Sequence, residues 1–424
     1  MRTATAHWPT HSIRLLLYVT ALATAVTVVI AITTLRGPSE RVFGMAIVGW
    51  HHDPFTVMRQ FEGSARPEMY WQPVTDVPGG LLATMFGGTA AYNGIVLLSF
   101  PLAAAAAFLL ARHLSLSAGG ATLAAMAFAF APFHIAHAAY HPHIAQVQWI
   151  PLYLLALWRC LDRASWTRAA LLAGATVAVT LSNFYGGLIA AAITPVAIGA
   201  YAIARRSTAT VRARDLALTF TLLAVLAMAG VAYIVIRAPE LIANRAAFAF
   251  PPIDLERYRA TAWSFLTPPV AHPVFGAAAI RFWDASGMRV GMLEQQVFLG
   301  WSVIALALVA TARWLNDRRG LVPVLVSIAG VALYFATSPP AWLYHALPMF
   351  RSYARFGVVV QLMTALVAGM GFDWLWHAAT WRGRTAAAVL TLLIVAEYAV
   401  SPLAMSRPAQ TVGAPTRSVT EASQ

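Results

Sequence analysis

About eleven apolar blocks, each roughly 17 to 25 residues long and separated by short charged connectors, dominate this sequence. A helix needs about 20 apolar residues to cross roughly 30 Å of hydrocarbon, whereas barrel strands alternate over about ten residues. The chain is 59% hydrophobic and only 11% charged, against about 25% charged residues in soluble domains. The sequence therefore predicts an all-α protein, a polytopic transmembrane helical bundle.

The spans can be placed from the apolar blocks and their flanking connectors. We expect them near residues 13–34, 91–111, 118–135, 146–161, 168–183, 186–204, 215–236, 293–312, 321–337, 355–376 and 385–402. The apolar core of the first block is longer than that of a secretory signal, which favours an uncleaved anchor. Residues 1–402 are thus predicted to form one transmembrane domain, and the polar residues 403–424 a disordered tail.

The arginines predict which way the chain lies in the membrane. The 29 basic residues are all arginines. Among the short connectors they occur in alternate ones, whereas the opposite connectors 136–145 and 184–185 contain none, and short arginine-rich connectors are retained in the cytoplasm. This pattern predicts a cytoplasmic N-terminus and an external C-terminus. The segments 35–90, 136–145, 237–292 and 338–354 would then lie outside, and most of the acidic residues fall in the two long outer loops, 35–90 and 237–292.

Composition also excludes some classes of function. A net charge of +13 could suggest nucleic acid, but in a membrane protein it indicates anchoring loops and anionic lipid. We expect membrane lipids as partners and no nucleic acid. A single cysteine, Cys160, excludes an internal disulfide and any cysteine metal cluster.

Among the acids, Asp53 is the first candidate for a catalytic residue, because it follows two histidines in the first outer loop. Pro54 suits the first turn of a short interfacial helix over 55–62, for which Asp53 would be the N-cap. Alternatively, Asp53 is a general base that takes a proton from an acceptor hydroxyl at the membrane surface. The sequence leaves both roles open.

Four of the twelve histidines lie within ten residues at an outer edge: His134, His137, His141 and His143. They could hold a metal, pack as interfacial polar groups, or pair with an anionic substrate or phosphate. The spacing lacks a tight zinc motif, so we predict no metal site and place these histidines among the candidate phosphate-binding residues.

Further candidates lie at other predicted outer ends. The glycines after Tyr185 permit a tight turn that would leave Asn183 and Tyr185 facing outward or into a cavity. Glu294 and Glu397 are acids at membrane depth, where such residues usually pair inward, and Glu397 is the predicted site residue of the two.

Arg351 and Arg355 are four residues apart at the entrance of the tenth span. On a helix they would share one face, where two guanidinium groups suit a diphosphate or a lipid phosphate. The alternative is that both side chains extend to lipid headgroups.

Several motifs occur in an order that resembles a known family. These are "DP" in the first loop, "AFAPFHIAHAAYHPHIAQVQWIPLYLLAL", "LSNFYGG", "AWSFLTPPVAHPVFG", "EQQVFLGWSVIAL" and "ALPMFRSYARFGVVVQLMTALVAGMG". Over roughly residues 40–400 they resemble bacterial polytopic membrane proteins of the GT-C glycosyltransferase superfamily, similar to glycosyltransferase family 39 and to YfhO-like proteins.

The resemblance implies a fold and a reaction. It implies a GT-C-like bundle in the bacterial inner membrane and a polyprenyl-phosphate sugar as donor. It also implies an acid of the first outer loop as base, which matches Asp53, and an arginine pair before the late span, which matches Arg351 and Arg355. Superfamily members often carry paired acids in this loop, and Glu62 or Glu68 could supply the second one.

The expected function is therefore transfer of a sugar from a polyprenyl-phosphate donor to a glycan or lipid acceptor on the outer face. The alternative is a non-catalytic membrane component of envelope glycan or lipid transport. A small-molecule carrier would require an inverted repeat of spans, and none is visible. Sequence patterns leave the sugar, the acceptor, the divalent metal dependence and the oligomeric state open.

Overall fold

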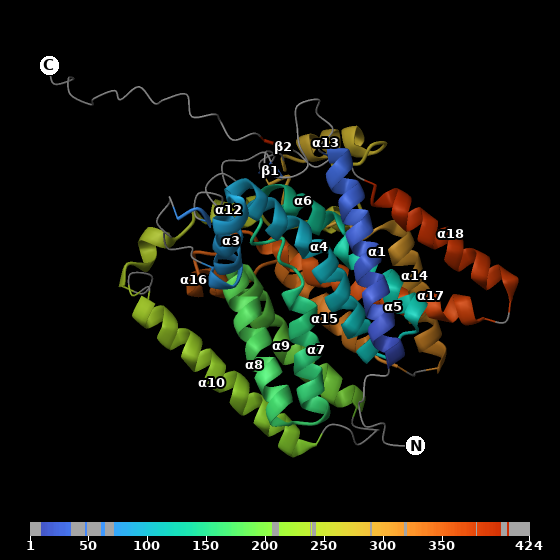
Figure 1. The fold of residues 1–424 in the computed structure, drawn as a ribbon, viewed down its shortest axis with the longest axis horizontal. Helices are drawn as coiled ribbons and strands as arrows, with labels where there is room; N and C mark the ends of the chain where they lie inside the picture. Colours follow the sequence, from blue (N-terminus) through green and yellow to red (C-terminus); the bar gives the residue numbers. More distant parts are fainter. Residues whose placement is uncertain are drawn as a thin grey trace.

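A computed structural model describes residues 10–34, 47–48, 61–63, 72–205, 212–237, 239, 243–288, 291–317, 320–378, 380–399 and 405–406. The predicted all-α architecture is confirmed, because helices make up nearly all of the regular structure in these residues (Figure 1). The predicted interfacial helix over 55–62 lies outside the described residues except for Phe61 and Glu62. Phe61 is buried against Gly79.

Each predicted span coincides with a helix. These helices are α1 (Thr10–Thr34), α4 (Gly88–His113), α5 (Ala118–Ala129), α7 (Trp149–Asp162), α8 (Trp166–Ser182), α9 (Phe184–Arg205), α10 (Ala213–Arg237), α14 (Trp301–Asp317), α15 (Val322–Thr337), α17 (Gly357–His377) and α18 (Trp381–Glu397). Six segments of the described chain are long and apolar enough to cross a membrane. Four of them are α1, α4, α9 and α10. The fifth is α5 together with the next helix, α6 (Pro132–Tyr140), and the sixth is α17 together with the 3-10 turn before it, η4 (Tyr353–Phe356). The other five helices have 14 to 17 residues, so the number of eleven crossings stays a prediction.

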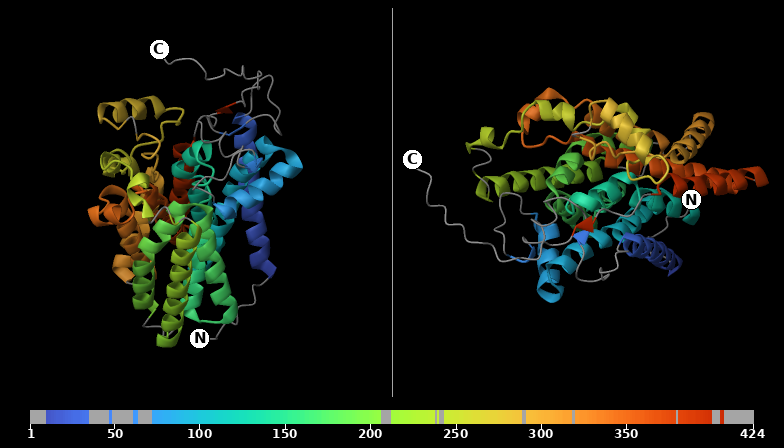
Figure 2. Two further views of the ribbon diagram at one scale, coloured as in Figure 1. Left: turned by 90° about the vertical axis from the view of Figure 1, so that its left-hand side faces the viewer. Right: turned by 90° about the horizontal axis from the view of Figure 1, so that it is seen from above.

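Short elements fill the predicted outer segments. They are α3 (Pro73–Phe86), α6 (Pro132–Tyr140), η2 (Arg245–Phe248), α12 (Ile253–Arg257), η3 (Ala262–Phe265), α13 (Gly276–Ala285), α16 (Ala341–Ala346) and η4 (Tyr353–Phe356), with the strands β1 (Ile47–Val48) and β2 (Met405–Ser406). In Figure 1 the elements α3, α6 and α13 lie at the upper end of the bundle. The turn between α7 and α8, the end of α9 and the start of α10 lie at the opposite, lower end, and Figure 2 shows the same arrangement from the side.

The helix α17 forms the centre of the bundle, where it packs against α5, α14 and α15. Small residues allow this close approach. A Cβ on Gly369 would lie 2.5 Å from the carbonyl oxygen of Gly120, and a Cβ on Gly371 would lie 2.0 Å from that of Leu306. Such close backbone contacts are the usual packing device of helices in membranes, where lipid competes for apolar side chains.

Two predicted spans have different ends in the structure. The span 118–135 is interrupted, because Ala131 precedes Pro132 and is extended, with ψ of 146°, before α6 begins. The span 293–312 begins only at Trp301, because Glu294, Gln295 and Gln296 lie in a buried turn. Gly300, directly before α14, has a φ of +85°, a conformation that favours glycine. Both irregular segments place polar side chains at the upper end.

The strands β1 and β2 form one antiparallel pair, with Ile47 opposite Ser406 and Val48 opposite Met405. The first loop and the segment after α18 therefore meet. Residues 405–406 belong to the predicted disordered tail, and the rest of 403–424 lies outside the described residues. If the chain crosses the membrane an odd number of times, as in the predicted arrangement of eleven spans, the first loop and the segment after α18 lie on the same side of the membrane.

Candidate functional site

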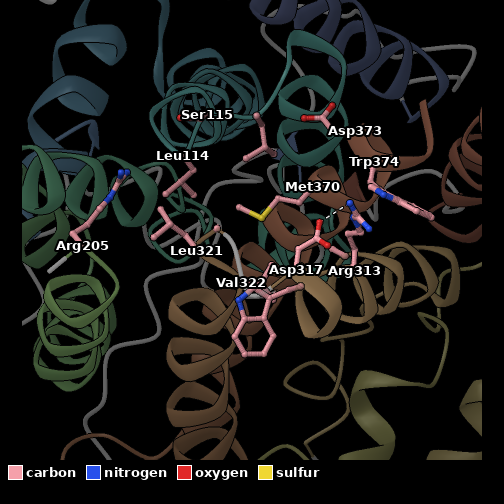
Figure 3. Close-up of a pocket in the computed structure, with 14 residues that line it drawn as sticks. Leu114, Ser115, Arg205, Arg313, Asp317, Leu321, Val322, Met370, Asp373 and Trp374 are labelled. Atoms are coloured by element: carbon pink, nitrogen blue, oxygen red, sulfur yellow. Dashed lines mark ion pairs between the residues drawn. The ribbon is translucent and has the colours of Figure 1, made fainter. Parts of the chain in front are cut away.

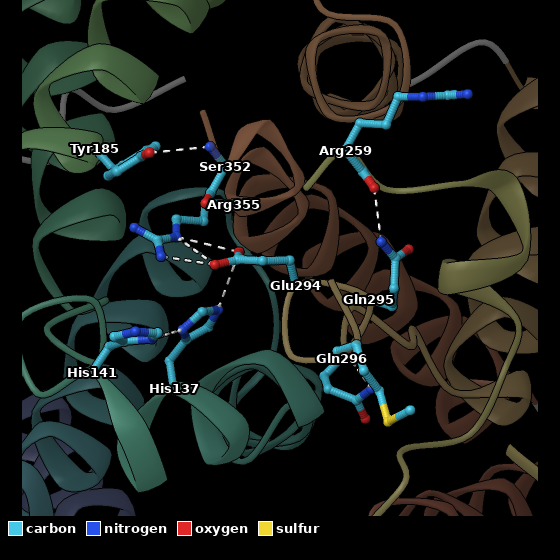
Figure 4. Close-up of polar contacts among 10 residues, drawn as sticks. His137, His141, Tyr185, Arg259, Glu294, Gln295, Gln296, Ser352 and Arg355 are labelled. Atoms are coloured by element: carbon cyan, nitrogen blue, oxygen red, sulfur yellow. Dashed lines mark hydrogen bonds and ion pairs between the residues drawn. The ribbon is translucent and has the colours of Figure 1, made fainter. Parts of the chain in front are cut away.

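Polar and charged side chains from five separate segments converge at the upper end. We call this group the upper cluster, and its members are His137, His141, Tyr185, Asp254, Glu294, Arg351 and Arg355. The segments are α6 with the residue that follows it, the start of α9, α12, the turn before α14, and the segment before α17. Figure 4 shows the part of the cluster around Arg355.

Arg355 and Glu294 form the buried ion pair of the upper cluster. Arg355 Nη2 donates to Glu294 Oε1 at 2.7 Å, and its Nε lies 3.1 and 3.2 Å from the two carboxylate oxygens. The side chains are only 12% and 5% exposed. This bidentate geometry is the strongest form of an Arg–carboxylate pair, and it orients both groups firmly.

Tyr185 connects the two arginines. Its hydroxyl oxygen accepts hydrogen bonds from the backbone N–H groups of Arg351 and Ser352, both at 3.1 Å. The guanidinium of Arg355 lies over its ring, 4.3 Å from the centre, in a cation–π contact. Tyr185 is placed there because α9 begins one residue before it, directly after a one-residue turn at Asn183.

Arg351 has a different environment from Arg355. Its Nη1 donates to Asp254 Oδ2 at 3.1 Å, and the guanidinium lies 4.2 and 4.7 Å from the ring centres of Phe250 and Tyr258. The expectation that Arg351 and Arg355 share one face of a helix is wrong, because Arg351 lies in an irregular segment and Arg355 in η4. The two residues are nevertheless linked through Tyr185, which contacts the backbone N–H of Arg351 and the guanidinium of Arg355.

His137 and His141 lie beside the ion pair. Their Nδ1 atoms are 3.2 Å apart, so one ring donates and the other accepts. His137 Nε2 is 3.8 Å from Glu294 Oε2, which is longer than a hydrogen bond. This nitrogen is buried and has no hydrogen-bond partner among the described residues. A buried polar atom without a partner is rare and indicates a group that could meet a ligand.

The other two histidines of the predicted group have separate partners. His134 is fully buried, where Nε2 pairs with Ser99 Oγ at 2.8 Å and Nδ1 with the carbonyl oxygen of Ala129 at 2.7 Å. His143 Nε2 lies 2.6 Å from Asp76 Oδ1 on α3. The four histidines are thus divided among three environments, and only His137 and His141 join the upper cluster.

Asn183 and Glu397 cap helices. Asn183 Oδ1 accepts from the backbone N–H of Gly186 at 2.7 Å, at the start of α9. Both oxygens of Glu397 accept from the N–H of Ser302, at 3.1 and 3.0 Å, and Oε1 also accepts from its hydroxyl at 2.6 Å, at the start of α14. Neither side chain hydrogen-bonds to a member of the upper cluster in the described part of the chain, and their role in substrate binding stays a prediction.

Asp53 and Glu68 lie outside the described residues, so the roles predicted for them as base and as second acid stay predictions. Glu62 is described, and its side chain lies beside Gly88 at the start of α4. Within the described ranges, no three His, Cys, Asp or Glu side chains are close enough together to hold a metal ion.

Glu294, Asp254 and Asp76 are polar partners that the sequence analysis did not select as site residues. Glu294 was recognised as an acid at membrane depth, and that feature could have identified it, since buried acids require partners. Asp254 stands among several charges of the second outer loop. No local pattern separates it from its neighbours.

Replacing Tyr185 with phenylalanine is expected to loosen the segment before α17. The backbone N–H groups of Arg351 and Ser352 would lose their common acceptor, at a cost of about 1–3 kcal/mol. The measurement is the midpoint of thermal unfolding in detergent, which should fall. Tyr153→Phe, which removes a hydroxyl that joins α7 to Thr194 on α9, is the matched control for the loss of a tyrosine hydroxyl elsewhere. An unchanged midpoint for Tyr185→Phe would show that these two donors find other acceptors.

A cavity of about 390 Å³ lies at the other end of the bundle. Figure 3 shows Arg313 and Asp317 paired on one wall, with Asp373, Trp374 and Arg205 around it. Asp373 also caps α5 by accepting from the N–H groups at its start. This cavity is separate from the predicted outer residues.

Comparisons with known proteins give solved structures of similar fold, whereas no family model and no curated protein sequence matches this chain. The apo oligosaccharyltransferase of Archaeoglobus fulgidus has a TM-score of 0.54 at 14% identity, covering 93% of this chain and 57% of that chain. AglB from the same organism, in complex with an inhibitory peptide and a dolichol-phosphate, has a TM-score of 0.51 at 14% identity, covering 90% and 55%.

ArnT from Cupriavidus metallidurans bound to undecaprenyl phosphate has a TM-score of 0.49 at 15% identity, covering 89% of this chain and 63% of that chain. This chain spans little more than half of the length of the two archaeal structures. At such low identity the likeness concerns the fold. The chain therefore shares the helical fold of these two archaeal oligosaccharyltransferases.

Proposed function

We propose that this protein is a membrane glycosyltransferase of the GT-C type. It transfers a sugar from a polyprenyl-phosphate donor to a glycan or lipid acceptor on the outer face of the bacterial inner membrane. The upper cluster would bind the phosphate of the donor, and Asp53 would act on the acceptor.

The observation that carries this proposal is the environment of Arg351. Its side chain is 37% exposed, and among the described residues only Nη1 of its guanidinium has a hydrogen-bond partner. A guanidinium has five N–H donors, so those on Nε and Nη2 remain for a phosphate oxygen. Phe250 and Tyr258 hold the group in place by their ring faces, so little ordering is needed on binding.

His137 and Arg355 support the same assignment. The unpaired Nε2 of His137 lies close to Glu294, the carboxylate that holds Arg355. A phosphate bound to Nε and Nη2 of Arg351 would meet donors that are fixed in advance, which is how enzymes stabilise a leaving oxyanion. In the transfer step, the acceptor oxygen forms a bond to the anomeric carbon while the bond from that carbon to the phosphate oxygen breaks. Asp53 would take the acceptor proton, and the configuration would invert.

The fold supports a lipid-linked donor. AglB, whose fold is similar, is described in complex with a dolichol-phosphate, which is a polyprenyl phosphate. The arginine-bearing turn between α7 and α8 and the start of α10 lie at the lower end, which the positive-inside rule assigns to the cytoplasm. The upper cluster would then face outward. The meeting of β1 with β2 agrees with a C-terminus on that side.

The test is binding of undecaprenyl phosphate to the purified full chain, measured by native mass spectrometry. We expect the phosphate to bind at least about tenfold more tightly than undecaprenol, which has the same chain without the phosphate. Arg351→Gln should remove this preference, whereas Arg257→Gln, which removes an exposed arginine paired with the same Asp254, should preserve it. Equal binding of the two lipids by the wild type would refute the proposed phosphate site.

A non-catalytic component of glycan or lipid transport is the second candidate. The observation that favours it is that the two carboxylates of the upper cluster, Asp254 and Glu294, are both held by arginines, so neither is free to act as a base. Such a protein would bind the lipid phosphate without sugar transfer. A transfer assay with a lipid-linked sugar in proteoliposomes separates the two functions.

A further inference from the structure

A second charged region lies at the lower end, far from the upper cluster. It surrounds a cavity of about 820 Å³ where the ends of four helices meet. The lining residues come from the end of α4, the turn between α7 and α8, the end of α9 and the start of α10; they are His113, Asp162, Arg163, Ala164, Arg205, Arg212, Arg214 and Asp215.

The two acids of this cavity have roles in the fold. Asp162 accepts a hydrogen bond from the Tyr201 hydroxyl at 2.8 Å and lies 3.5 Å from His113 Nε2. Asp215 is buried and accepts from the N–H of Ala164 at 3.0 Å, which ties α10 to the turn after α7. Both carboxylates therefore hold neighbouring helices together.

The arginines of the cavity are in a different situation. Arg163, Arg212 and Arg214 are exposed, and no hydrogen bond or ion pair engages their side chains within the described part of the chain. Arg205 is half-buried, contacts the Tyr201 ring, and also lines the smaller cavity of Figure 3. The cavity thus has four guanidinium groups against two carboxylates that are already engaged, so it favours an anion.

The surface beside the cavity is apolar. The apolar stretch of α10 is almost wholly exposed, since only 6% of it is buried inside the protein. Leu218, Phe220 and Met228 are exposed along it. Trp166 at the start of α8 is 93% exposed, as is typical of a tryptophan at a membrane interface. The basic cavity therefore adjoins a helix surface that hydrocarbon chains would cover.

We propose that this cavity binds the phosphate headgroup of an anionic phospholipid from the membrane leaflet at the lower end. The guanidinium groups would hold the phosphate, and the acyl chains would lie along α10 and α8. A soluble phosphate compound would leave this apolar surface unused. Basic pockets between membrane helices commonly bind anionic headgroups in this way.

The experiment measures binding of cardiolipin and phosphatidylglycerol to the purified full chain by native mass spectrometry, with phosphatidylcholine as the neutral lipid. We expect both anionic lipids to bind in preference to phosphatidylcholine. In the triple variant Arg163→Gln, Arg212→Gln, Arg214→Gln, their affinity should fall roughly a hundredfold, at about fivefold for each arginine.

The matched control is Arg281→Gln, Arg382→Gln, Arg384→Gln, which removes the same charge from exposed arginines outside the cavity. It should retain the anionic lipids. The single variant Arg214→Gln, with about a fivefold loss, serves if the triple variant unfolds. Equal losses in both triple variants would overturn the proposal, because net charge alone would then explain binding. Displacement of the lipid by equimolar glycerol phosphate would also overturn it, since the site would then be one for a soluble phosphate.

Discussion

Replacing Asp53 with asparagine is expected to reduce sugar transfer about 10²- to 10⁴-fold, because a general base that accepts the acceptor proton contributes about that much. Asparagine has nearly the same shape, so the affinity for polyprenyl phosphate should stay as in the wild type. The measurements are product formation from a lipid-linked sugar in proteoliposomes and native mass spectrometry of the lipid complex.

The control for Asp53→Asn is Glu256→Gln, which neutralises an exposed acid of the second outer loop. We expect it to retain transfer. If the Asp53→Asn variant folds and transfers sugar at the wild-type rate, Asp53 is not the base. If Glu62→Gln also loses transfer, the first outer loop contains a pair of acids that act together.

The second large effect concerns the pair of Arg355 and Glu294. Arg355→Gln leaves the carboxylate of Glu294, which is 5% exposed, without its bidentate cation. Breaking a buried ion pair from one side costs about 3–5 kcal/mol, because one charge remains buried and uncompensated. We expect a marked fall in the midpoint of thermal unfolding for this variant.

The double variant Arg355→Gln, Glu294→Gln separates structure from function. Two amides can hydrogen-bond to one another without a buried charge, so most of the lost stability should return. The affinity for undecaprenyl phosphate should not return, since the positive charge is absent. A double variant as unstable as the single one would show that the ion pair is not the source of the effect, and full lipid binding by the double variant would exclude Arg355 from the phosphate site.

The spans could be predicted because their cause is local. Hydrocarbon thickness sets the length of each apolar block, and every predicted span coincides with a helix. The ends were less predictable. The break before Pro132 follows from proline chemistry and could have been read from the sequence, whereas the late start of α14 depends on a buried turn whose polar side chains bond to remote segments.

The site was only partly predictable, because its contacts join residues far apart in the chain. Five candidate residues were identified from the sequence, and they lie in one cluster: His137, His141, Tyr185, Arg351 and Arg355. Their partners were not, since Glu294 and Asp254 are 61 and 97 positions from the arginines that they hold. Spacing along one helix predicted a shared face for Arg351 and Arg355, but the 3-10 turn and the Tyr185 hydroxyl determine their positions.

The short strand pair has a consequence for how the protein is made. Ile47 leaves the ribosome long before Ser406, yet the two residues are paired. Contacts of such high sequence separation form late in folding. Ile47 and Val48 can therefore take up their paired position only after α18 has been inserted, so this contact closes the described fold at the end of folding.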